Sequence, residues 1–339
     1  MKLKNFLFFI IAVFTSLAII YSCEIYELPS YKMMDIGSYN RDMAITDMQK
    51  FVENISAYAK GLKTGFIVIP QNGSELIYNE TDKSLGVRSS YINAIDGVGI
   101  EELFYDWQGK KITDDARLNR LIKIKTDYSL PIMVSDYVRN TVPQSSIDLN
   151  EVHGFLAFPR INGNYDYFYH YIINETTPPP KVNTNNITNL SDAKNYLYVI
   201  NTDKFSSKSD MITKISKTNY DVLIIDLFYE KTPLSIADIN SLRTKLNGGH
   251  RLVIAYINIG AAETFRYYWK GNPPYLVKPY GGGYTDEYYA GFWTNDWQEI
   301  IFNNGESLND SSYIKQIIDA GFDGIYMDNV EAYLQIPKK

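Results

Sequence analysis

Residues 321–339, GFDGIYMDNVEAYLQIPKK, contain a short apolar run that ends in acidic and amide side chains. The run at 322–327 predicts a strand buried on both faces, and Asp328, Asn329 and Glu331 follow it in a loop. Carboxylates placed directly after a buried strand are typical of the way α/β enzymes present reactive groups. Because a single strand forms no core, the rest of the chain must supply its parallel neighbours.

Similar apolar runs recur along the chain, and none shows the alternation of a half-exposed strand. Helical periodicity at 41–61, 236–246 and 313–320 separates several of them, as expected for βαβ units. Counted as strands are 66–69 (FIVI), 97–100 (GVGI), 131–134 (PIMV), 196–200 (YLYVI), 222–225 (VLII), 252–257 (LVIAYI), 289–293 (YAGFW) and 322–327. A ninth run, 154–159 (GFLAFP), has no assigned place.

Eight strands with helical crossovers predict an α/β fold of the (β/α)8, or TIM-barrel, type. A doubly wound open sheet is the alternative. Its usual nucleotide-binding versions are disfavoured, because no G-x-G-x-x-G or G-x-x-x-x-G-K-[ST] motif follows any strand.

Residues 174–195 interrupt the pattern with three consecutive prolines and many Asn and Thr. This composition predicts a linker that is stiff at 178–180 and loose afterwards. Each side of the linker holds too few strands for a barrel, so we expect the two sides to pack together rather than fold independently.

The first residues predict a leader segment. Lys2 and Lys4 precede an apolar run at 6–21, which is shorter than the roughly 20 residues that a membrane-spanning helix needs, and this favours a signal peptide over residues 1–22. Ile20, Ser22 and Cys23 resemble the lipobox of bacterial lipoproteins, which implies lipidation of Cys23 and export across the inner membrane to a lipid-anchored position. An uncleaved anchor, or a secretory signal with an incidental cysteine, are the alternatives.

Composition excludes several function classes. The net charge is −6, and no basic stripe is present to neutralise phosphates, so nucleic acid is not an expected partner. The three histidines lack ligand spacing and Cys23 is the single cysteine, so no metal site or cofactor is predicted. A G-x-S-x-G elbow is absent, which disfavours serine hydrolysis.

Nearly every predicted strand ends in a carboxylate or an amide. Each one alone is explained by capping of the next helix, but in a parallel barrel these ends share one rim. A rim rich in carboxylates and aromatic rings suits glycoside hydrolysis, in which one carboxylic acid protonates the leaving oxygen and a second carboxylate attacks or activates water. The rim residues are Gln71, Asn72, Glu101, Glu102, Asp136, Asn201, Asp226, Asn258, Glu263 and Asp328.

The segments VLIIDLFYE (222–230), VIAYINIGAAETFRYYW (253–269) and AGFDGIYMDNVEAY (320–333) resemble the first part of the barrel of glycoside hydrolase family 114, which includes endo-α-1,4-polygalactosaminidases. Residues 41–60, GFIVIPQNGSEL (65–76), IDGVGIEELFYDWQ (95–108), IMVSDYV (132–138) and GFLAFP resemble its second part, which here comes first. This order implies a circular permutation. The expected organisation is a tether at 23–39, strands 6 to 8 within 40–173, the linker at 174–195, and strands 1 to 5 within 196–339.

The resemblance implies roles for individual residues. Asp328 falls at the position of a catalytic aspartate, as nucleophile or base, and Glu101 at that of the second catalytic carboxylate, as acid, with Glu102 as the fallback. Candidate substrate-binding residues are Asn72, Asp136, Asp226, Tyr256, Glu263, Arg266 and Trp269. The implied substrate is a polysaccharide, with an α-1,4-linked galactosamine-containing glycan as the specific expectation.

One departure from the family pattern stands at Ala261, where many relatives carry glutamate in G-E-A-E. If that carboxylate is needed for turnover, the alternative function is that of a carbohydrate-binding surface lipoprotein that keeps the barrel without catalysis.

Overall fold

The computed structural model describes residues 31–138, 143–160, 179–281, 284–303, 305 and 311–338. Residues 32–339 form one compact unit. The expected signal peptide at 1–22 and Cys23 lie outside the described residues. Within the described ranges, every helix falls short of the length and apolar character needed to cross a membrane.

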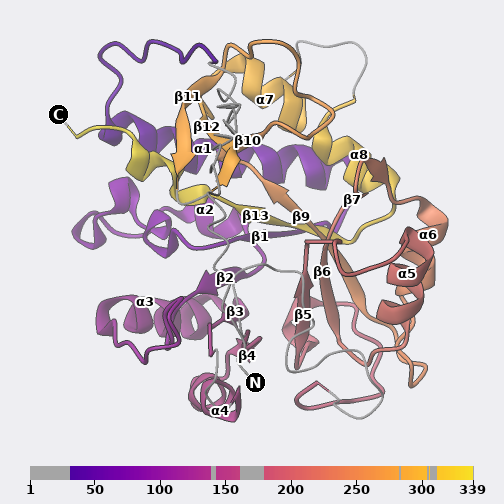
Figure 1. Cartoon of the computed structure of the whole chain (residues 1–339). Coiled ribbons are helices and arrows are strands. Elements are labelled where there is room, and N and C mark those ends of the chain that lie inside the picture. The colour runs from indigo at the N-terminus through magenta and orange to yellow at the C-terminus, as the bar shows by residue number, and fades with distance from the viewer. Residues whose placement is uncertain are drawn as a thin grey trace, which may run out of the picture. The chain divides into compact units, whose positions relative to one another are not determined.

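Among the described residues, a five-stranded and a three-stranded parallel sheet make up the centre of the fold (Figure 1). The first has the order β1-β13-β9-β6-β5 and the second the order β2-β3-β4, and a parallel bridge between Gln71 and Gly99 joins β1 to β2. The strands are β1 (Ile67–Pro70), β2 (Val98–Glu101), β3 (Ile132–Ser135), β4 (Leu156–Ala157), β5 (Tyr196–Val199), β6 (Val222–Asp226), β9 (Leu252–Asn258) and β13 (Gly324–Asp328).

Strand β13, close to the C-terminus, lies between β9 and β1 (Figure 1). Its register aligns Gly324 with Ile67 and Met327 with Pro70, and on its other side Asp328 with Asn258. The two sides of the 174–195 segment are thus joined by a continuous ladder. Two segments far apart in the sequence share one sheet.

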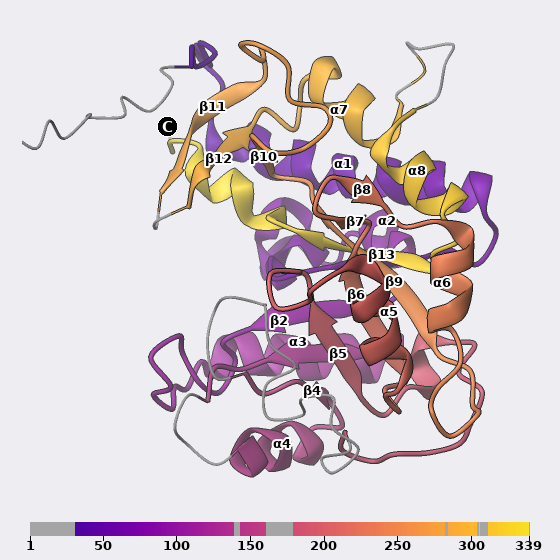
Figure 2. The same cartoon turned by 45° about the vertical axis from the view of Figure 1, so that its right-hand side comes forward.

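The strand count from sequence needs two corrections. Residues 284–290 form β12 (Tyr284–Ala290), which is antiparallel to β10 (Ala261–Glu263) and β11 (Leu276–Gly281), so YAGFW does not belong to the parallel set. Figure 2 shows this small sheet beside α7 (Asn295–Phe302) and away from β2, β3 and β4. The unplaced run GFLAFP supplies β4 instead. Counted from β5, β13 is the fourth strand and not the fifth.

The strand order ends at β4 and β5. No ladder joins these two strands among the described residues, but the ring of Phe158 just after β4 packs 5.4 Å, centroid to centroid, from that of Tyr196 at the start of β5. The two ends of the order are therefore in contact. Closure into a barrel stays a prediction.

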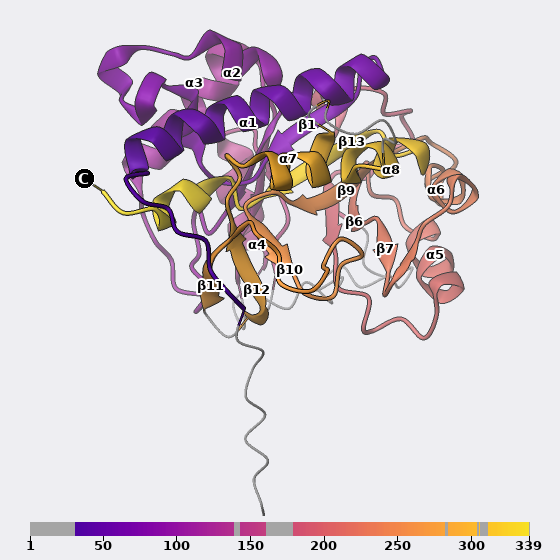
Figure 3. The same ribbon diagram turned by 90° about the horizontal axis from the view of Figure 1, so that it is seen from above.

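Helices cover the outside of the strands. The long α1 (Arg41–Leu62) begins at Asn40, whose side chain caps the N–H groups of Asp42 and Met43, and it lies between α2 and the α7–α8 pair (Figure 3). Arg41 donates hydrogen bonds to the carbonyls of Leu334 and Ile336. The other α-helices are α2 (Ser89–Ala94), α3 (Asp115–Tyr128), α4 (Pro143–Val152), α5 (Lys208–Ser216), α6 (Ile236–Leu242) and α8 (Tyr313–Asp319).

The remaining elements are short. They are the hairpin strands β7 (Phe228–Tyr229) and β8 (Thr232–Pro233), and the 3₁₀ helices η1 (Ser74–Ile77), η2 (Asn79–Thr81), η3 (Lys83–Leu85), η4 (Leu190–Asp192) and η5 (Val330–Gln335).

Tyrosine rings from β5, β9 and β13 pack together. Tyr198 lies 5.1 Å from Tyr326 and 6.3 Å from Tyr256, measured between ring centroids, and its hydroxyl donates to Gln71 Oε1 (2.9 Å). Gly99 on β2 makes room for this packing, since a Cβ there would lie 2.1 Å from the Tyr326 hydroxyl. Bulky rings on one strand therefore require a glycine on another.

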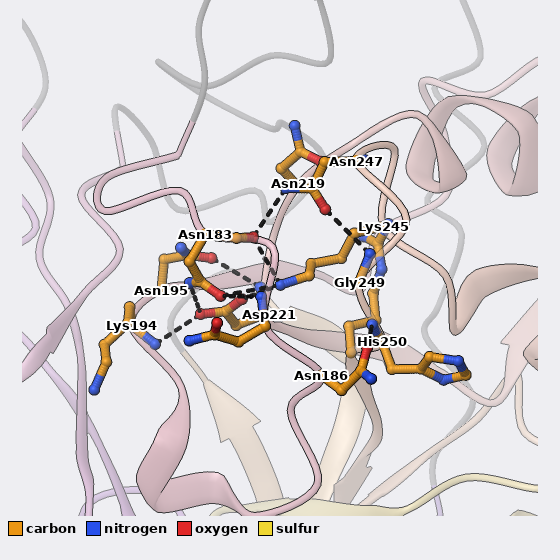
Figure 4. Close-up of polar contacts among 12 residues, drawn as sticks. Asn183, Asn186, Lys194, Asn195, Asn219, Asp221, Lys245, Asn247, Gly249 and His250 are labelled. Carbon is orange, nitrogen blue, oxygen red and sulfur yellow. Dashed lines mark hydrogen bonds and ion pairs between the residues drawn. The ribbon is translucent and has the colours of Figure 1, made fainter.

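At the amino ends of β5, β6 and β9, a fully buried ion pair joins Lys245 to Asp221 (Figure 4). The Lys245 ammonium lies 2.9 Å from Asp221 Oδ1 and also donates to the carbonyl of Asn183. Asp221 Oδ2 accepts from the Asn183 amide and from the backbone N–H of Lys194. The segment expected to be loose after Pro180 is thus held in place, because buried charges hold the polar groups that satisfy them. Residues 174–178 of the linker lie outside the described ranges.

We predict that Lys245→Met lowers the free energy of unfolding by about 3–5 kcal/mol, because Asp221 is left buried without its cation. Urea denaturation at neutral pH measures the change. The matched control is Lys315→Met, which removes the surface pair with Asp319 (2.6 Å) and should cost less than about 1 kcal/mol. Equal losses in the two variants would contradict a clamping role for Lys245.

Candidate active site

A cavity of about 960 Å³ opens at the carboxyl ends of the parallel strands. Residues from β2, β6, β9 and β13 line it together with residues from β11 and β12. The lining residues include Asn72, Glu101, Tyr137, Asp226, Tyr256, Glu263, Phe265, Arg266, Tyr280, Glu287, Asp328, Asn329 and Glu331.

Asp328, the last residue of β13, is held in a fixed orientation. Its Oδ2 accepts from the Tyr256 hydroxyl (2.7 Å) and its Oδ1 from the backbone N–H of Asn329 (2.7 Å). Asn329 adopts a left-handed conformation (φ 59°), which asparagine tolerates, and its side chain is bound by Tyr280 and Asn258. Burial raises the pKa of Asp328, whereas the two hydrogen bonds lower it.

Glu101, the last residue of β2, lies in the same cavity with 18% of its side chain exposed. Burial raises the pKa of Glu101 to about 7, Arg160 opposes the rise, and the Asp328 carboxylate adds to it. The Tyr137 hydroxyl donates to Glu101 Oε1 (3.3 Å), and Arg160 Nη2 lies 3.6 Å from the same oxygen. Glu101 is therefore able to carry a proton near neutral pH.

Asp226, Arg266 and Glu263, which also line the cavity, form a buried ionic cluster. Arg266 binds Asp226 with two parallel hydrogen bonds (2.9 and 2.7 Å) and Glu263 Oε2 through Nε (2.6 Å). Two carboxylates thus share one cation. Burial raises the pKa of Glu263, and Arg266 lowers it. Such bidentate geometry fixes the side chains that face the cavity.

Asn72 acts on Glu101 through the backbone. Its Oδ1 accepts from the N–H of Glu101 (3.0 Å) and from Arg117 Nη2 (2.8 Å), and its own backbone is left-handed (φ 64°). It positions the end of β2 and also lines the cavity.

Two expected substrate contacts lie away from this cavity. Asp136 is fully buried, and its Oδ1 accepts from the backbone N–H groups of Leu103, Phe104 and Tyr105. Its Oδ2 accepts from the Ser146 hydroxyl (2.7 Å), so both carboxylate oxygens are bound within the protein. Trp269 is absent from the lining residues, and its ring centroid lies 5.6 Å from that of Tyr288.

The cavity also contains residues that the sequence analysis did not select. Glu287 on β12 pairs in register with Glu263, and burial together with Glu263 and Asp328 raises its pKa to about 8. No pattern singled it out, because β12 was assigned to the parallel set. Arg160, which follows β4 and contacts Glu101 without being among the residues that line the cavity, was also missed, because GFLAFP had no assigned place.

The described residues contain no group of three or more His, Cys, Asp or Glu side chains arranged to hold a metal ion. What the cavity offers is a pair of buried carboxyl groups whose pKa values are both raised: Asp328, held by two hydrogen bonds, and Glu101, beside Tyr137 and Arg160. Parallel βα units carrying such a pair at the strand ends define a class of proteins suited to carboxylate-based acid–base chemistry.

Residues 177–339 match the model of the glycoside-hydrolase family GH114. This match supports a protein of the glycoside hydrolase family 114 type. The match includes Asp328, Asp226, Glu263 and Arg266, whereas Glu101 lies before it.

Three curated relatives are similar to parts of the chain, and each is described only as an uncharacterized protein. The one from Thermotoga maritima is 30% identical over 35% of this chain and 35% of its own length. The one from Methanocaldococcus jannaschii is 29% identical over 44% and 41%, and the one from Deinococcus radiodurans 27% over 36% and 37%. The chain thus spans less than half the length of each of these relatives.

A solved structure of a U32 peptidase aligns over 77% of this chain and 92% of its own, with 9% identity and a TM-score of 0.33. A similarity this low does not bear on function.

We predict that Glu287→Gln flattens the dependence of stability on pH. Its pKa is about 8 in the folded protein against an ordinary 4.5, so the folded state binds more protons between these values and stability falls as pH rises through that range. Glutamine removes this loss. Unfolding free energies of the variant and the wild type should differ little at pH 4 and favour the variant at pH 9.

The control for this measurement is Asp319→Asn, which alters an exposed carboxylate in a surface pair. Parallel pH curves for Glu287→Gln and the wild type would contradict the raised pKa of Glu287.

Proposed function

We propose that the protein hydrolyses a glycosidic bond in a polysaccharide, with Asp328 and Glu101 as the catalytic carboxylates. The observation that supports this most strongly is that two carboxyl groups from distant parts of the sequence line one cavity, and that burial raises the pKa of one of them, Glu101, to about 7. Glu101 acts as the acid that protonates the leaving oxygen. Asp328, held by Tyr256 and Asn329, acts as the nucleophile or as the base that activates water.

The charge of the cavity supports a cationic glycan as substrate. Nine carboxylates line it among the described residues, against one arginine, and that arginine is bound to Asp226 and Glu263. Such an excess attracts and binds positively charged sugar units. We propose an α-1,4-linked glycan that contains galactosamine, with Asp226, Glu263, Arg266, Asn72 and Tyr256 around the bound chain.

Asp328→Asn and Glu101→Gln are each expected to lower the rate of glycan cleavage about 10²–10⁴-fold, because each removes one proton-transferring or attacking group. Release of reducing ends from polygalactosamine measures the rate, and circular dichroism checks the fold. The control Asp319→Asn should cleave at the wild-type rate. Wild-type rates in both site variants would contradict the assignment.

The pH profile distinguishes the roles. If Glu101 is the acid, cleavage falls as pH rises through about 7, since the required proton is lost. Binding of the glycan without cleavage by the wild type at any pH would instead favour the carbohydrate-binding alternative that Ala261 suggests.

We further propose that the strands close into a circularly permuted (β/α)8 barrel. The ladder between β1 and β13 supports it, as do the contacts of Arg41 with the carbonyls near the C-terminus and the contact between Phe158 and Tyr196. In this arrangement the segment before β5 connects what would be the two ends of an unpermuted chain.

Export and lipidation are part of the proposal. Cys23→Ser is expected to move the protein from the detergent phase to the aqueous phase in a Triton X-114 partition of bacterial cells, because the cysteine carries the lipid anchor. Immunoblotting of both phases measures it. Recovery of the wild type from the aqueous phase would contradict the anchor.

A further inference from the structure

A second cavity of about 520 Å³ lies next to the first, on the side of β1, β2 and α3. Its volume falls within the range of roughly 300–1,000 Å³ that is usual for ligand sites. The lining residues are Asn72, Glu75, Glu101, Glu102, Asp114, Arg117, Arg120 and Glu331. Asn72, Glu101 and Glu331 line both cavities, so the two spaces meet at Glu101.

The wall of the second cavity is built by hydrogen bonds to the elements around it. Arg117 donates to Asn72 Oδ1 (2.8 Å), which also accepts from the N–H of Glu101 (3.0 Å). Asp114 caps α3 by accepting from the N–H of Arg117 (2.9 Å). The end of β2 and the start of α3 are therefore fixed relative to each other.

Hydrogen bonds also fix the part of the wall that contains Glu75 and Arg120. Glu75 accepts from the Tyr333 hydroxyl (2.5 Å) and pairs with Arg120 (3.4 Å), which also donates to Ser74 Oγ (2.8 Å). The cavity thus presents guanidinium donors beside carboxylate acceptors. A mixed set of this kind matches the hydroxyl and amino groups of a sugar better than it matches an anion or an apolar ligand.

Glu101 and Asp328 differ in their relation to the two cavities. Asp328 lines the first cavity but not the second, whereas Glu101 lines both. The sugar that is attacked must lie over Asp328, and the leaving sugar must lie beyond the group that gives it a proton. The attacked sugar therefore belongs in the first cavity, and the leaving sugar belongs on the side of Glu101 where the second cavity lies.

We propose that the second cavity binds the leaving-group side of the glycan, so that the chain runs past Glu101 into the space lined by Glu102 and Arg120. This inference rests on the proposed function. The bond between the anomeric carbon and the bridging oxygen breaks, its electron pair goes to that oxygen, and the proton of Glu101 completes the new hydroxyl there. Water supplies the hydroxyl on the anomeric carbon; its other proton restores Glu101 if Asp328 is the nucleophile, and goes to Asp328 if Asp328 is the base.

The variant Glu102→Asn tests the site. Glu102 lines the second cavity only and has a left-handed backbone (φ 54°), which asparagine tolerates. Two substrates are compared: polygalactosamine, and a p-nitrophenyl glycoside of a galactosamine oligomer, whose small leaving group has no sugar to place in the cavity. We expect kcat/KM to fall about tenfold more for the polymer than for the aryl glycoside. Arg120→Gln, which changes another wall residue, should shift the ratio in the same direction.

Glu80→Asn is the matched control, because Glu80 has the same residue type and nearly the same backbone (φ 52°) but lines neither cavity. It should leave the ratio of the two rates at the wild-type value.

A ratio unchanged in both Glu102→Asn and Arg120→Gln would overturn the second cavity as a leaving-group site while the proposed function stands. Failure of the wild type to hydrolyse either substrate would overturn both.

Discussion

The ladder between β1 and β13 is the constraint on which the site depends. It places the strand that carries Asp328 beside the first strand of the fold, and the bridge from Gln71 to Gly99 then brings β2 and Glu101 to the same rim. Each of these contacts is made by backbone groups, so the relative positions of the two carboxylates are set by the sheet and not by flexible loops. Groups mounted on strands are held more closely than groups mounted on loops.

The electrostatics of the rim and of the opposite end of the strands follow different rules. At the amino ends, the fully buried side chains of Asp221 and Lys245 neutralise each other, and Asn183 forms hydrogen bonds with both. At the rim, carboxylates outnumber cations, and the raised pKa values of Glu101 and Glu287 result from burial. The ion pair at the amino ends contributes to the stability of the fold. The carboxyl groups at the rim keep protons to a higher pH, and the folded state loses stability as pH rises and these protons are released.

Much of this arrangement could be predicted from the sequence. Apolar runs buried on both faces located seven of the eight parallel strands, and the polar residues after them included Asp328, Glu101, Asp226 and Glu263. YAGFW was misplaced because an apolar run carries no information about the direction of its partner, and β12 pairs antiparallel. Asp136 directly follows a parallel strand, as several cavity residues do. What distinguishes it is the set of three backbone N–H groups that it binds, which the sequence does not reveal. Glu287 could not be found, since its place depends on a hairpin pairing rather than on a strand end.

The position of β13 has a consequence for biogenesis. During synthesis, β1 to β4 leave the ribosome early, yet one edge of β1 has no partner until residues 324–328 emerge. An unpaired strand edge is open to pairing with other chains, so the nascent protein passes through a long interval in which aggregation competes with folding. The yield of folded molecules then depends on how soon β13 is synthesised and pairs with β1. Holdase chaperones that shield the early half of the chain would raise that yield.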